Sequence, residues 1–503
     1  MAHICQFVLR SAFVPVFLAA FTIGCANDGS VGLSVGKERR IVGYMLDVSR
    51  YRVPTMETMK RQVDILAGLG YNHLQLYTEH TFAYKGHESV WREASPFTPD
   101  EIRELDLYCA ERGIELVPNQ NSFGHLEKWL CHPDYNHLAE APQGGVHWGK
   151  SQIEAFPSSL CPTDPESIEF ISGLYDQLLP CFRSRYLNVG GDETRELLEN
   201  GEVRIGRSAA AIREKGPHRV YLEFINKLHG LVSERKHTMM FWGDIILQKP
   251  ELVEELPKDI IALDWGYEAN HPFDRETAAL KAAGVKFAVC PGTSTWGSIL
   301  GRTDVMIANI DSAVENGEKN GAMGAILTDW EQYPQSWICS LPAIVYFSRR
   351  MQGRRLSRVE LASEIDRIAG CRVGESLLDL GDVYRKVSTL NDWYVYDTSL
   401  RQLLVLGEDY PWGRNDSTRE RFRAALEAWQ LARAKMDLSG GELWVRDDVA
   451  VIDLIAKAVE MRIEEPHKKN FRAVIEPDYR RFWLRQYRPG GLSDVINVCF
   501  SSR

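Results

Sequence analysis

Short apolar runs alternate with stretches of helical periodicity along the chain from Ile41 onward. The runs predict eight strands, at residues 41–48, 71–77, 114–118, 186–189, 238–242, 260–264, 285–289 and 324–328. The stretches between them have apolar residues at three- and four-residue spacing, as at Met56, Met59, Val63 and Leu66. Thr98-Pro-Asp-Glu101 has the sequence of a capping box and predicts the start of another helix.

This alternation favours an α/β fold, a (β/α)8 barrel over residues 41–353. An open doubly wound sheet is the alternative, but its usual Gly-rich phosphate turn does not follow the first strand. After about Arg354 the pattern is helical only, which predicts a helical C-terminal region at residues 354–503. The segment 126–162 has little regular pattern, and long connections of this kind are typically binding loops or lids.

The first 25 residues differ from the rest. Arg10 precedes an apolar run at 12–23, and Gly24-Cys25 is followed by a polar stretch. This order is typical of a secretory signal, and the position of Cys25 resembles a bacterial lipoprotein cleavage site. A plain signal peptide cut nearby is the alternative. Residues 26–40 then form a polar tether, and we expect an exported protein, periplasmic or at the cell surface, with lipid on Cys25 as its membrane anchor.

The net charge of the chain disfavours some classes of binding partner. The formal net charge is −10, which argues against non-specific nucleic-acid binding, because that requires a basic face. After the first 25 residues, no stretch is apolar enough to span a bilayer. The spacing of His73, His80 and His125 matches no zinc motif, so the sequence predicts neither a metal nor a cofactor.

The segment Arg185–Thr194 carries the clearest chemical signal. A short apolar strand stops at Gly190 and Gly191, and the paired acids Asp192 and Glu193 follow at once. Barrel enzymes place catalytic groups at the carboxyl ends of their strands in this way. An ordinary helix start, with Asp192 as the N-cap, is the alternative that these ten residues leave open.

The other strand ends decide between these two interpretations, because they are rich in aromatic, acidic and amide side chains. Indole faces suit the apolar face of a sugar ring, and carboxylates, amides and hydroxyls suit its OH groups. Four tryptophans beside an acid pair therefore favour a sugar-binding pocket, although any single tryptophan could be core material. The candidate site residues are Arg50, Glu79, Asn121, His125, Asp192, Glu193, Trp242, Asp244, Trp265, Tyr267, Trp296, Asp329 and Trp330.

Gly190-Gly-Asp-Glu193 after a fourth strand is similar to the signature of glycoside hydrolase family 20, the β-N-acetylhexosaminidases. Asn119-Gln-Asn-Ser-Phe-Gly-His-Leu-Glu127, Leu160-Cys-Pro-Thr-Asp-Pro165 and Leu327-Thr-Asp-Trp330 resemble motifs of its D-type branch. The resemblance covers about residues 42–347. It implies a barrel and an exo-acting, retaining mechanism, in which the substrate's 2-acetamido oxygen closes an oxazoline ring.

The resemblance also implies roles for individual residues. Asp192 would hold the acetamido N–H and stabilise the developing charge, and Glu193 would protonate the leaving oxygen and later activate water. Tyr267 is the candidate for orienting the acetamido carbonyl. Many members carry an arginine near the first strand, where this chain has Val42. Arg50 or Glu79 could replace it, or the preferred sugar could differ.

The expected function is removal of terminal β-linked N-acetylglucosamine or N-acetylgalactosamine from an oligosaccharide or glycoconjugate. Two alternatives remain open at this point. One is a related glycosidase for another modified amino sugar, and the other is a surface lipoprotein that binds glycans without cleaving them. Retention of both Asp192 and Glu193 disfavours a protein that only binds.

Overall fold

Eight parallel strands carry the core of the computed structural model. The structure describes residues 40–144, 156–198, 206–331, 334–388, 399–406, 416–465 and 471–500. The expected signal peptide and most of the tether therefore lie outside the described residues. The strands are β1 (Ile41–Asp47), β2 (His73–Tyr77), β3 (Glu115–Val117), β4 (Tyr186–Asn188), β5 (Thr238–Trp242), β6 (Ile261–Trp265), β7 (Lys286–Cys290) and β8 (Gly324–Asp329).

The strands form a nearly closed barrel. Their order is β3-β2-β1-β8-β7-β6-β5-β4, and each neighbouring pair is parallel. Just past the end of β3, a parallel bridge between Asn119 and Asn188 joins the two edges. Gln120 N donates to Asn188 O over 2.9 Å at this seam. The predicted (β/α)8 barrel is confirmed.

Strand periodicity separates two layers of core. Inward residues such as Met45, Leu263 and Ile326 pack together inside the barrel. Their neighbours Tyr44 and Leu327 belong to the larger layer between strands and helices. Successive strand residues point to opposite faces, so this alternation decides which strand-end side chains face the barrel axis.

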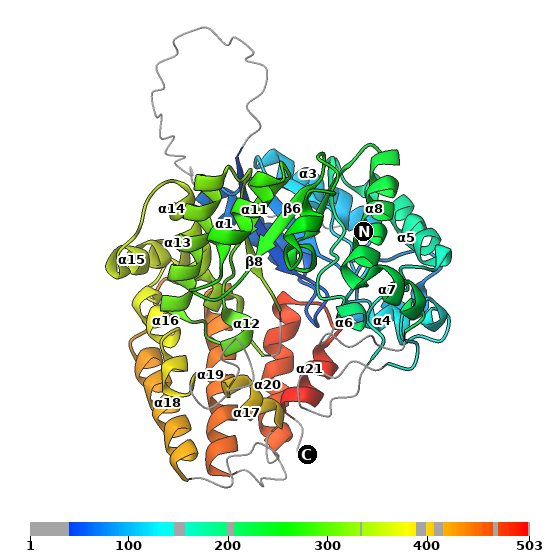
Figure 1. Cartoon of the computed structure of the whole chain (residues 1–503). Helices are drawn as coiled ribbons and strands as arrows, with labels where there is room; N and C mark the ends of the chain where they lie inside the picture. Colours follow the sequence, from blue (N-terminus) through cyan, green and yellow to red (C-terminus); the bar gives the residue numbers. More distant parts are fainter. Residues whose placement is uncertain are drawn as a thin grey trace, which may run out of the picture. The chain divides into compact units, whose positions relative to one another are not determined.

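Helices surround the barrel, and neighbouring helices contact one another around the ring (Figure 1). Thr98 and Glu101 form the predicted capping box at the start of α3. The principal surrounding helices are α1 (Met56–Leu69), α3 (Pro99–Glu111), α5 (Pro165–Leu178), α8 (Pro217–Glu234), α11 (Phe273–Ala282), α13 (Thr303–Asn320) and α14 (Leu341–Met351).

Short helices occupy the connections between these elements. The α-helical ones are α2 (Glu88–Trp91), α4 (Glu127–Leu130), α6 (Arg195–Leu198), α7 (Ala209–Lys215), α9 (Asp244–Leu247), α10 (Pro250–Val253) and α12 (Thr295–Ser298). The 3-10 turns are η1 (Arg92–Ala94), η2 (Asn136–Leu138), η3 (Leu179–Cys181), η5 (Trp337–Ser340) and η6 (Val383–Lys386).

The described part of the C-terminal region is helical, as predicted. Helices α18 (Asp416–Ala434), α19 (Leu443–Glu464) and α20 (Phe471–Gln486) run beside one another (Figure 1). Asp448 of α19 accepts a hydrogen bond from Ile338 N (2.8 Å), and Arg488 pairs with Glu101 (2.8 Å). These contacts fasten the region to the barrel. Its helices are α15 (Arg358–Ala369), α16 (Gly374–Leu380), α17 (Ser399–Leu406), α18 (Asp416–Ala434), α19 (Leu443–Glu464), α20 (Phe471–Gln486) and α21 (Leu492–Cys499).

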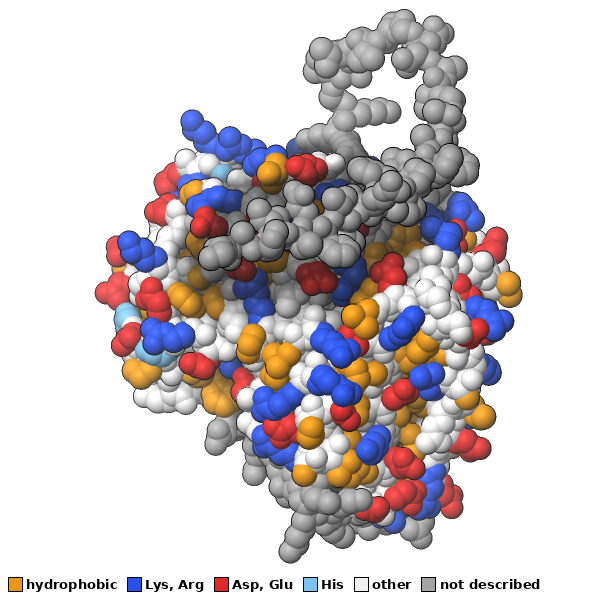
Figure 2. All heavy atoms as spheres, turned by 180° about the vertical axis from the view of Figure 1, so that it is seen from behind, with side chains coloured by type: hydrophobic (Ala, Val, Ile, Leu, Met, Phe, Trp, Pro, Cys, Tyr) orange, Lys and Arg blue, Asp and Glu red, His pale blue; other side chains and the backbone are white. Residues whose placement is uncertain are grey.

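The described surface is charged and mixed. On the face drawn in Figure 2, lysine and arginine side chains lie interspersed with aspartate and glutamate, without a broad area of positive charge. Within the described ranges, none of the helices combines the length and apolar character needed to cross a bilayer.

Candidate active site

Two glycines turn the chain at the end of β4. Gly190 and Gly191 have φ angles of 71° and 94°, which side-chain-bearing residues rarely adopt. A Cβ on Gly190 would lie 2.5 Å from Asn121 Oδ1, so the turn can press against the segment after β3 only with glycine there. Tyr221 fixes the turn by donating to Gly191 O over 2.9 Å. The following acids, Asp192 and Glu193, are thereby brought against that segment.

His125 lies between the two acids. Its Nε2 is 3.3 Å from Asp192 Oδ2 and 3.3 Å from Glu193 Oε2. His125 and Glu193 both have left-handed backbone angles, with φ of 56° and 47°. Such angles are uncommon for residues other than glycine and persist where surrounding structure enforces them, often at functional sites.

The contacts among these groups set their charges. Burial opposes protonation of His125, but the charge and proximity of Asp192, followed by Glu193, raise the pKa of its imidazole well above the ordinary value. Burial also opposes ionisation of Glu193. Contact with His125 and the charge of Arg195, whose Nη2 lies 2.7 Å from Glu193 Oε1, nevertheless lower the pKa of Glu193 to about 2. The resting arrangement therefore holds Glu193 as a carboxylate.

The two acids differ in exposure and in partners. The Asp192 side chain is 6% exposed, and its Oδ1 is buried without a hydrogen-bond donor among the described residues. The Glu193 side chain is 28% exposed. A buried carboxylate oxygen that lacks a donor is costly, and a ligand N–H can satisfy it. Asp192 is thus arranged as an acceptor, and Glu193 is the more accessible acid.

Arg50 follows β1 and links three parts of the site. Its Nη1 donates to Asp47 Oδ2 over 3.1 Å, and its Nε lies 3.8 Å from Glu79 Oε1. Its guanidinium stands 4.8 Å from the centre of the Trp330 ring. Its Nη2 is also 3.5 Å from His125 Nδ1. Arg50 therefore supplies positive charge between two buried acids and the indole.

Tyr77 connects Glu79 and Asn121. Its hydroxyl donates to Glu79 Oε1 over 3.0 Å and accepts from Asn121 Nδ2 over 2.7 Å. Burial raises the pKa of Glu79 to about 7, although the charge of Arg50 opposes the shift. The Arg50–Glu79 pair is therefore sensitive to pH near neutrality.

The segments after β5, β6 and β8 complete the site from the other side. Asp244 Oδ2 accepts from Glu193 N over 3.2 Å, and its Oδ1 accepts from Trp265 Nε1 over 3.3 Å. Burial, and after it the charge of Asp192, raise the pKa of Asp244 well above its usual range. Trp265 stacks on Tyr267 with ring centres 5.1 Å apart, and Trp330 Nε1 donates to the Tyr267 hydroxyl over 2.7 Å.

These contacts form a closed circuit at the carboxyl end of the barrel. Each residue in it touches the next, and the last touches the first. The members come from the ends of six strands, which makes this end of the barrel a single constellation of charged and aromatic groups. In order, they are Arg50, His125, Glu193, Asp244, Trp265, Tyr267 and Trp330.

Three other sequence-predicted residues take different places. Trp242 is fully buried beneath Trp330, with ring centres 6.0 Å apart, and Trp296 meets the Tyr267 ring edge-on at 4.9 Å. Asp329 lies outside the circuit. Its oxygens accept from Tyr44, Thr293 and Ser340 in the layer between strands and helices. Because Trp330 faces the barrel axis, the residue before it on the strand faces outward.

Sequence reasoning did not select Tyr77 or Arg195. Tyr77 ends β2, where only Glu79 was chosen, and Arg195 stands two residues after Glu193 in the same motif. The sequence signal that could have identified them is their position, at the end of β2 for Tyr77 and shortly after β4 for Arg195. Their contacts with Glu79 and Glu193 depend on side-chain direction, which spacing alone does not give.

Comparison with known proteins agrees with this geometry. Residues 42–297 match the model of the glycosyl hydrolase family 20 catalytic domain. The chain belongs to glycosyl hydrolase family 20. Family members are glycoside hydrolases, and the matched residues run from Val42 in β1 through β7 to Gly297.

Relatives within the family are distant in sequence. Hexosaminidase D of Homo sapiens is 23% identical over 309 residues, which are 57% of this chain and 60% of that protein. A β-hexosaminidase of Akkermansia muciniphila is 26% identical over 220 residues, 40% of this chain and 43% of that protein. The chain thus spans about half of the length of the curated relatives it matches.

Solved structures support the fold. The Flavobacterium johnsoniae chitobiase superposes with a TM-score of 0.54 at 14% identity, covering 92% of this chain and 78% of that one. A β-N-acetylhexosaminidase from Bacteroides fragilis gives a TM-score of 0.52 at 18% identity over 65% of this chain and 68% of that one. At these identities the likeness concerns the fold alone.

Proposed function

We propose that this family 20 protein is an exo-acting β-N-acetylhexosaminidase that works with retention and with help from the substrate. The observation that carries the proposal is the unlike environment of two adjacent carboxylates. Asp192 Oδ1 is buried and accepts no hydrogen bond from a described residue, whereas Glu193 is partly exposed beside it. An acetamido N–H is a donor of the kind that Asp192 Oδ1 lacks.

The chemistry follows from that pair. Glu193, a carboxylate at rest, first takes a proton from the His125 imidazolium, whose Nε2 is 3.3 Å from Glu193 Oε2. The acetamido oxygen of the bound sugar then attacks C1, the bond from C1 to the leaving oxygen breaks, and Glu193 gives that oxygen its proton. Asp192 accepts the N–H hydrogen bond and stabilises the positive charge of the oxazolinium ion. Water then attacks C1 as Glu193 removes a proton from it, and the ring reopens with retained configuration.

The aromatic members of the circuit have a supporting role. We assign Trp265 and Trp330 to the apolar face of the sugar, and Tyr267 to the acetamido carbonyl. Arg50 and Glu79 are charged groups at the β1–β2 side, suited to outer hydroxyls of the sugar. Either could take the place of a first-strand arginine, and the two side chains are adjacent, with 3.8 Å between Arg50 Nε and Glu79 Oε1.

Glu193→Gln tests the proposal. An amide cannot donate and retrieve the proton, so we expect kcat to fall by about 10²–10⁴-fold on a β-linked N-acetylglucosamine disaccharide. The loss on nitrophenyl N-acetyl-β-glucosaminide or galactosaminide should be smaller, because nitrophenol leaves with less protonation. Initial rates on both substrates measure the difference.

Glu223→Gln is the matched control, since Glu223 is an exposed acid on α8 with a 45% exposed side chain. It should keep wild-type rates. Undiminished turnover by Glu193→Gln would remove Glu193 from the reaction. A thiazoline inhibitor that fails to bind, together with hydrolysis of unacetylated amino sugars, would favour the other amino-sugar glycosidase. Calorimetric glycan binding without any product would favour a protein that only binds.

We also propose export, with lipid on Cys25. The support is the basic start, the apolar run at 12–23 and the Gly24-Cys25 pair. In a bacterial host, the protein should partition with membranes after cell fractionation, and Cys25→Ala should release it to the soluble exported fraction. Wild-type protein recovered with the cytoplasm would contradict the proposal.

A further inference from the structure

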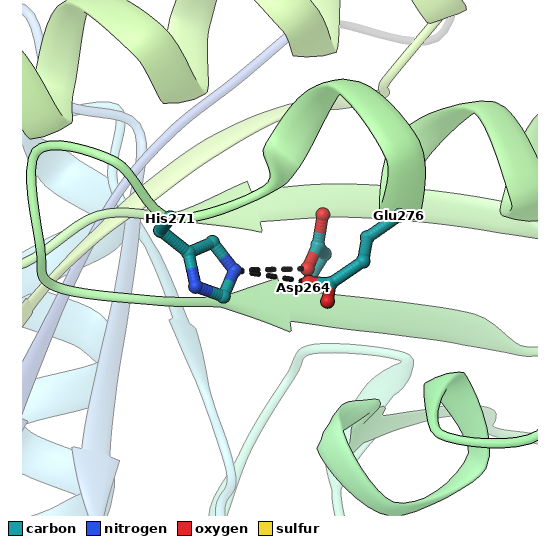
Figure 3. A group of neighbouring side chains, drawn as sticks. All are labelled: Asp264, His271 and Glu276. Carbon is teal, nitrogen blue, oxygen red and sulfur yellow. Dashed lines mark ion pairs between the residues drawn. The ribbon is translucent and has the colours of Figure 1, made fainter.

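A second group of ionisable side chains converges behind β6, on the side away from Trp265. Asp264 comes from β6, His271 from the segment after it, and Glu276 from the first turn of α11 (Figure 3). His271 Nε2 is 3.0 Å from Glu276 Oε2 and 3.9 Å from Asp264 Oδ1. One ligand atom from each of the three lies within 4.8 Å of the other two.

Asp264 has no described donor at hydrogen-bond distance, and His271 Nε2 lies 3.9 Å from its Oδ1. It is fully buried, and neither of its carboxylate oxygens accepts a hydrogen bond from any described residue. The contrast is Asp329, equally buried on the outward side of β8, whose oxygens accept from Tyr44, Thr293 and Ser340. Buried carboxylates normally have such donors or bind a metal. The groups that face Asp264 are instead the Nε2 atom of His271 and the carboxylate of Glu276.

We propose that Asp264, His271 and Glu276 bind a divalent transition-metal cation, of which Zn²⁺ is the best match. The donor set is one imidazole nitrogen and two carboxylate oxygens, which suits Zn²⁺ and allows a water as fourth ligand. The two carboxylates carry a charge of −2, which the cation neutralises.

The geometry needs little adjustment. Zinc bonds of about 2.0–2.2 Å place tetrahedral donors about 3.3 Å apart. The pair formed by His271 and Glu276, 3.0 Å apart, is close to this separation, and His271 Nε2 and Asp264 Oδ1, 3.9 Å apart, must approach by about 0.6 Å. His271 and Glu276 can make that movement, because their side chains are 20% and 16% exposed and are not locked in the core.

The cation would fix part of the active site from behind. The His271 ring packs against Gly266, where an added Cβ would lie 2.1 Å from it. Gly266 stands between Trp265 and Tyr267, and its carbonyl accepts from Asn309 Nδ2 over 2.8 Å. A metal joining β6 to α11 would therefore hold the backbone from which both aromatic residues project. Its role is structural, since none of its three ligands belongs to the circuit.

The test is zinc binding by the purified, untagged protein after treatment with a chelator. We expect one Zn²⁺ per chain by elemental analysis after buffer exchange, and a Tm raised by roughly 2–5 °C at saturating Zn²⁺. Asp264→Asn and Glu276→Gln should each lose the bound zinc and the shift. Asp274→Asn should keep both, since Asp274 is an exposed acid in the same first turn of α11.

Two results would overturn the proposal. One is wild-type protein that retains no zinc and shows an unchanged Tm. The other is equal zinc content and an equal shift in Asp264→Asn, Glu276→Gln and Asp274→Asn, which would place the ion elsewhere on the surface. If Asp264→Asn does not fold, Glu276→Gln decides, because Glu276 lies at the solvent edge. None of these readouts uses hydrolysis, so they stand apart from the proposed function.

Discussion

Two clusters in this barrel contain the same kinds of side chain, a histidine between two carboxylates, yet their surroundings differ. At the end of β4, His125 stands 3.3 Å from both Asp192 and Glu193, with Arg50 and Arg195 in contact. Behind β6, His271 faces Asp264 and Glu276, and the nearby Arg275 is 77% exposed and 3.5 Å from Glu276.

The difference lies in how each cluster balances its charge. In the first, His125 and Arg195 overcome burial and lower the pKa of Glu193 to about 2. In the second, burial raises the pKa of Asp264 to about 7, although contact with His271 opposes the shift, and contact with His271 lowers the pKa of Glu276. The first cluster has two arginines beside its histidine. The second has one exposed arginine, and its fully buried Asp264 accepts no hydrogen bond from a described residue.

Neutralising one buried aspartate in each cluster should affect catalysis very differently. Asp192→Asn should lower kcat by about 10²–10³-fold, because it removes the charge opposite the oxazolinium ion. Asp264→Asn should change kcat less than about threefold, since Asp264 faces away from the circuit. Steady-state rates on nitrophenyl N-acetyl-β-glucosaminide measure both.

Circular dichroism spectra of the two variants provide the control for folding. Equal losses of kcat in two well-folded variants would contradict the assignment of catalysis to the cluster after β4 and of a structural role to the cluster behind β6. An Asp192→Asn variant with near wild-type kcat would remove that residue from charge stabilisation.

Asp329 differs from both aspartates, because it is a buried acid that already accepts hydrogen bonds from three hydroxyl groups. Asp329→Asn should destabilise the fold by about 1–3 kcal/mol, since hydroxyls of Tyr44, Thr293 and Ser340 lose a charged acceptor. KM should stay within about threefold of wild type. Urea unfolding and substrate titration measure the two quantities. A tenfold rise in KM with unchanged stability would mean that Asp329 contacts the substrate, as predicted from the sequence.

Most of the barrel could be predicted from sequence, because strand and helix periodicities are local properties. The strand-end sites of Asp192 and Glu193 followed from two glycines after an apolar strand. The outward direction of Asp329 did not, since one residue of register at a strand end reverses the side that a side chain faces. A tryptophan at a strand end could likewise lie beneath the site, as Trp242 does.

The cluster behind β6 was beyond sequence reasoning for another reason. Its three residues come from a strand, a loop and a helix, at spacings that match no metal motif. The prediction of no metal rested on the spacing of His73, His80 and His125, and His271 lies in a later segment. Only the fold brings His271 to Asp264. Clusters assembled from separate elements are in general visible only in three dimensions.

Arg195 gives the smallest expected effect and tests the charge balance of the first cluster. Glu193 must be protonated to act as the acid, so the rate falls as pH rises through its pKa. Arg195→Met removes a positive charge 2.7 Å from Glu193 Oε1, which raises that pKa. The basic limb of the kcat profile, which reports Glu193 in the substrate complex, should therefore move to higher pH, by about one unit. Arg103→Met, on an exposed turn of α3, should leave the profile in place. An unmoved limb in an active Arg195→Met variant would mean that Arg195 does not hold Glu193 ionised, and that His125 and Arg50 set the resting charge of the acid.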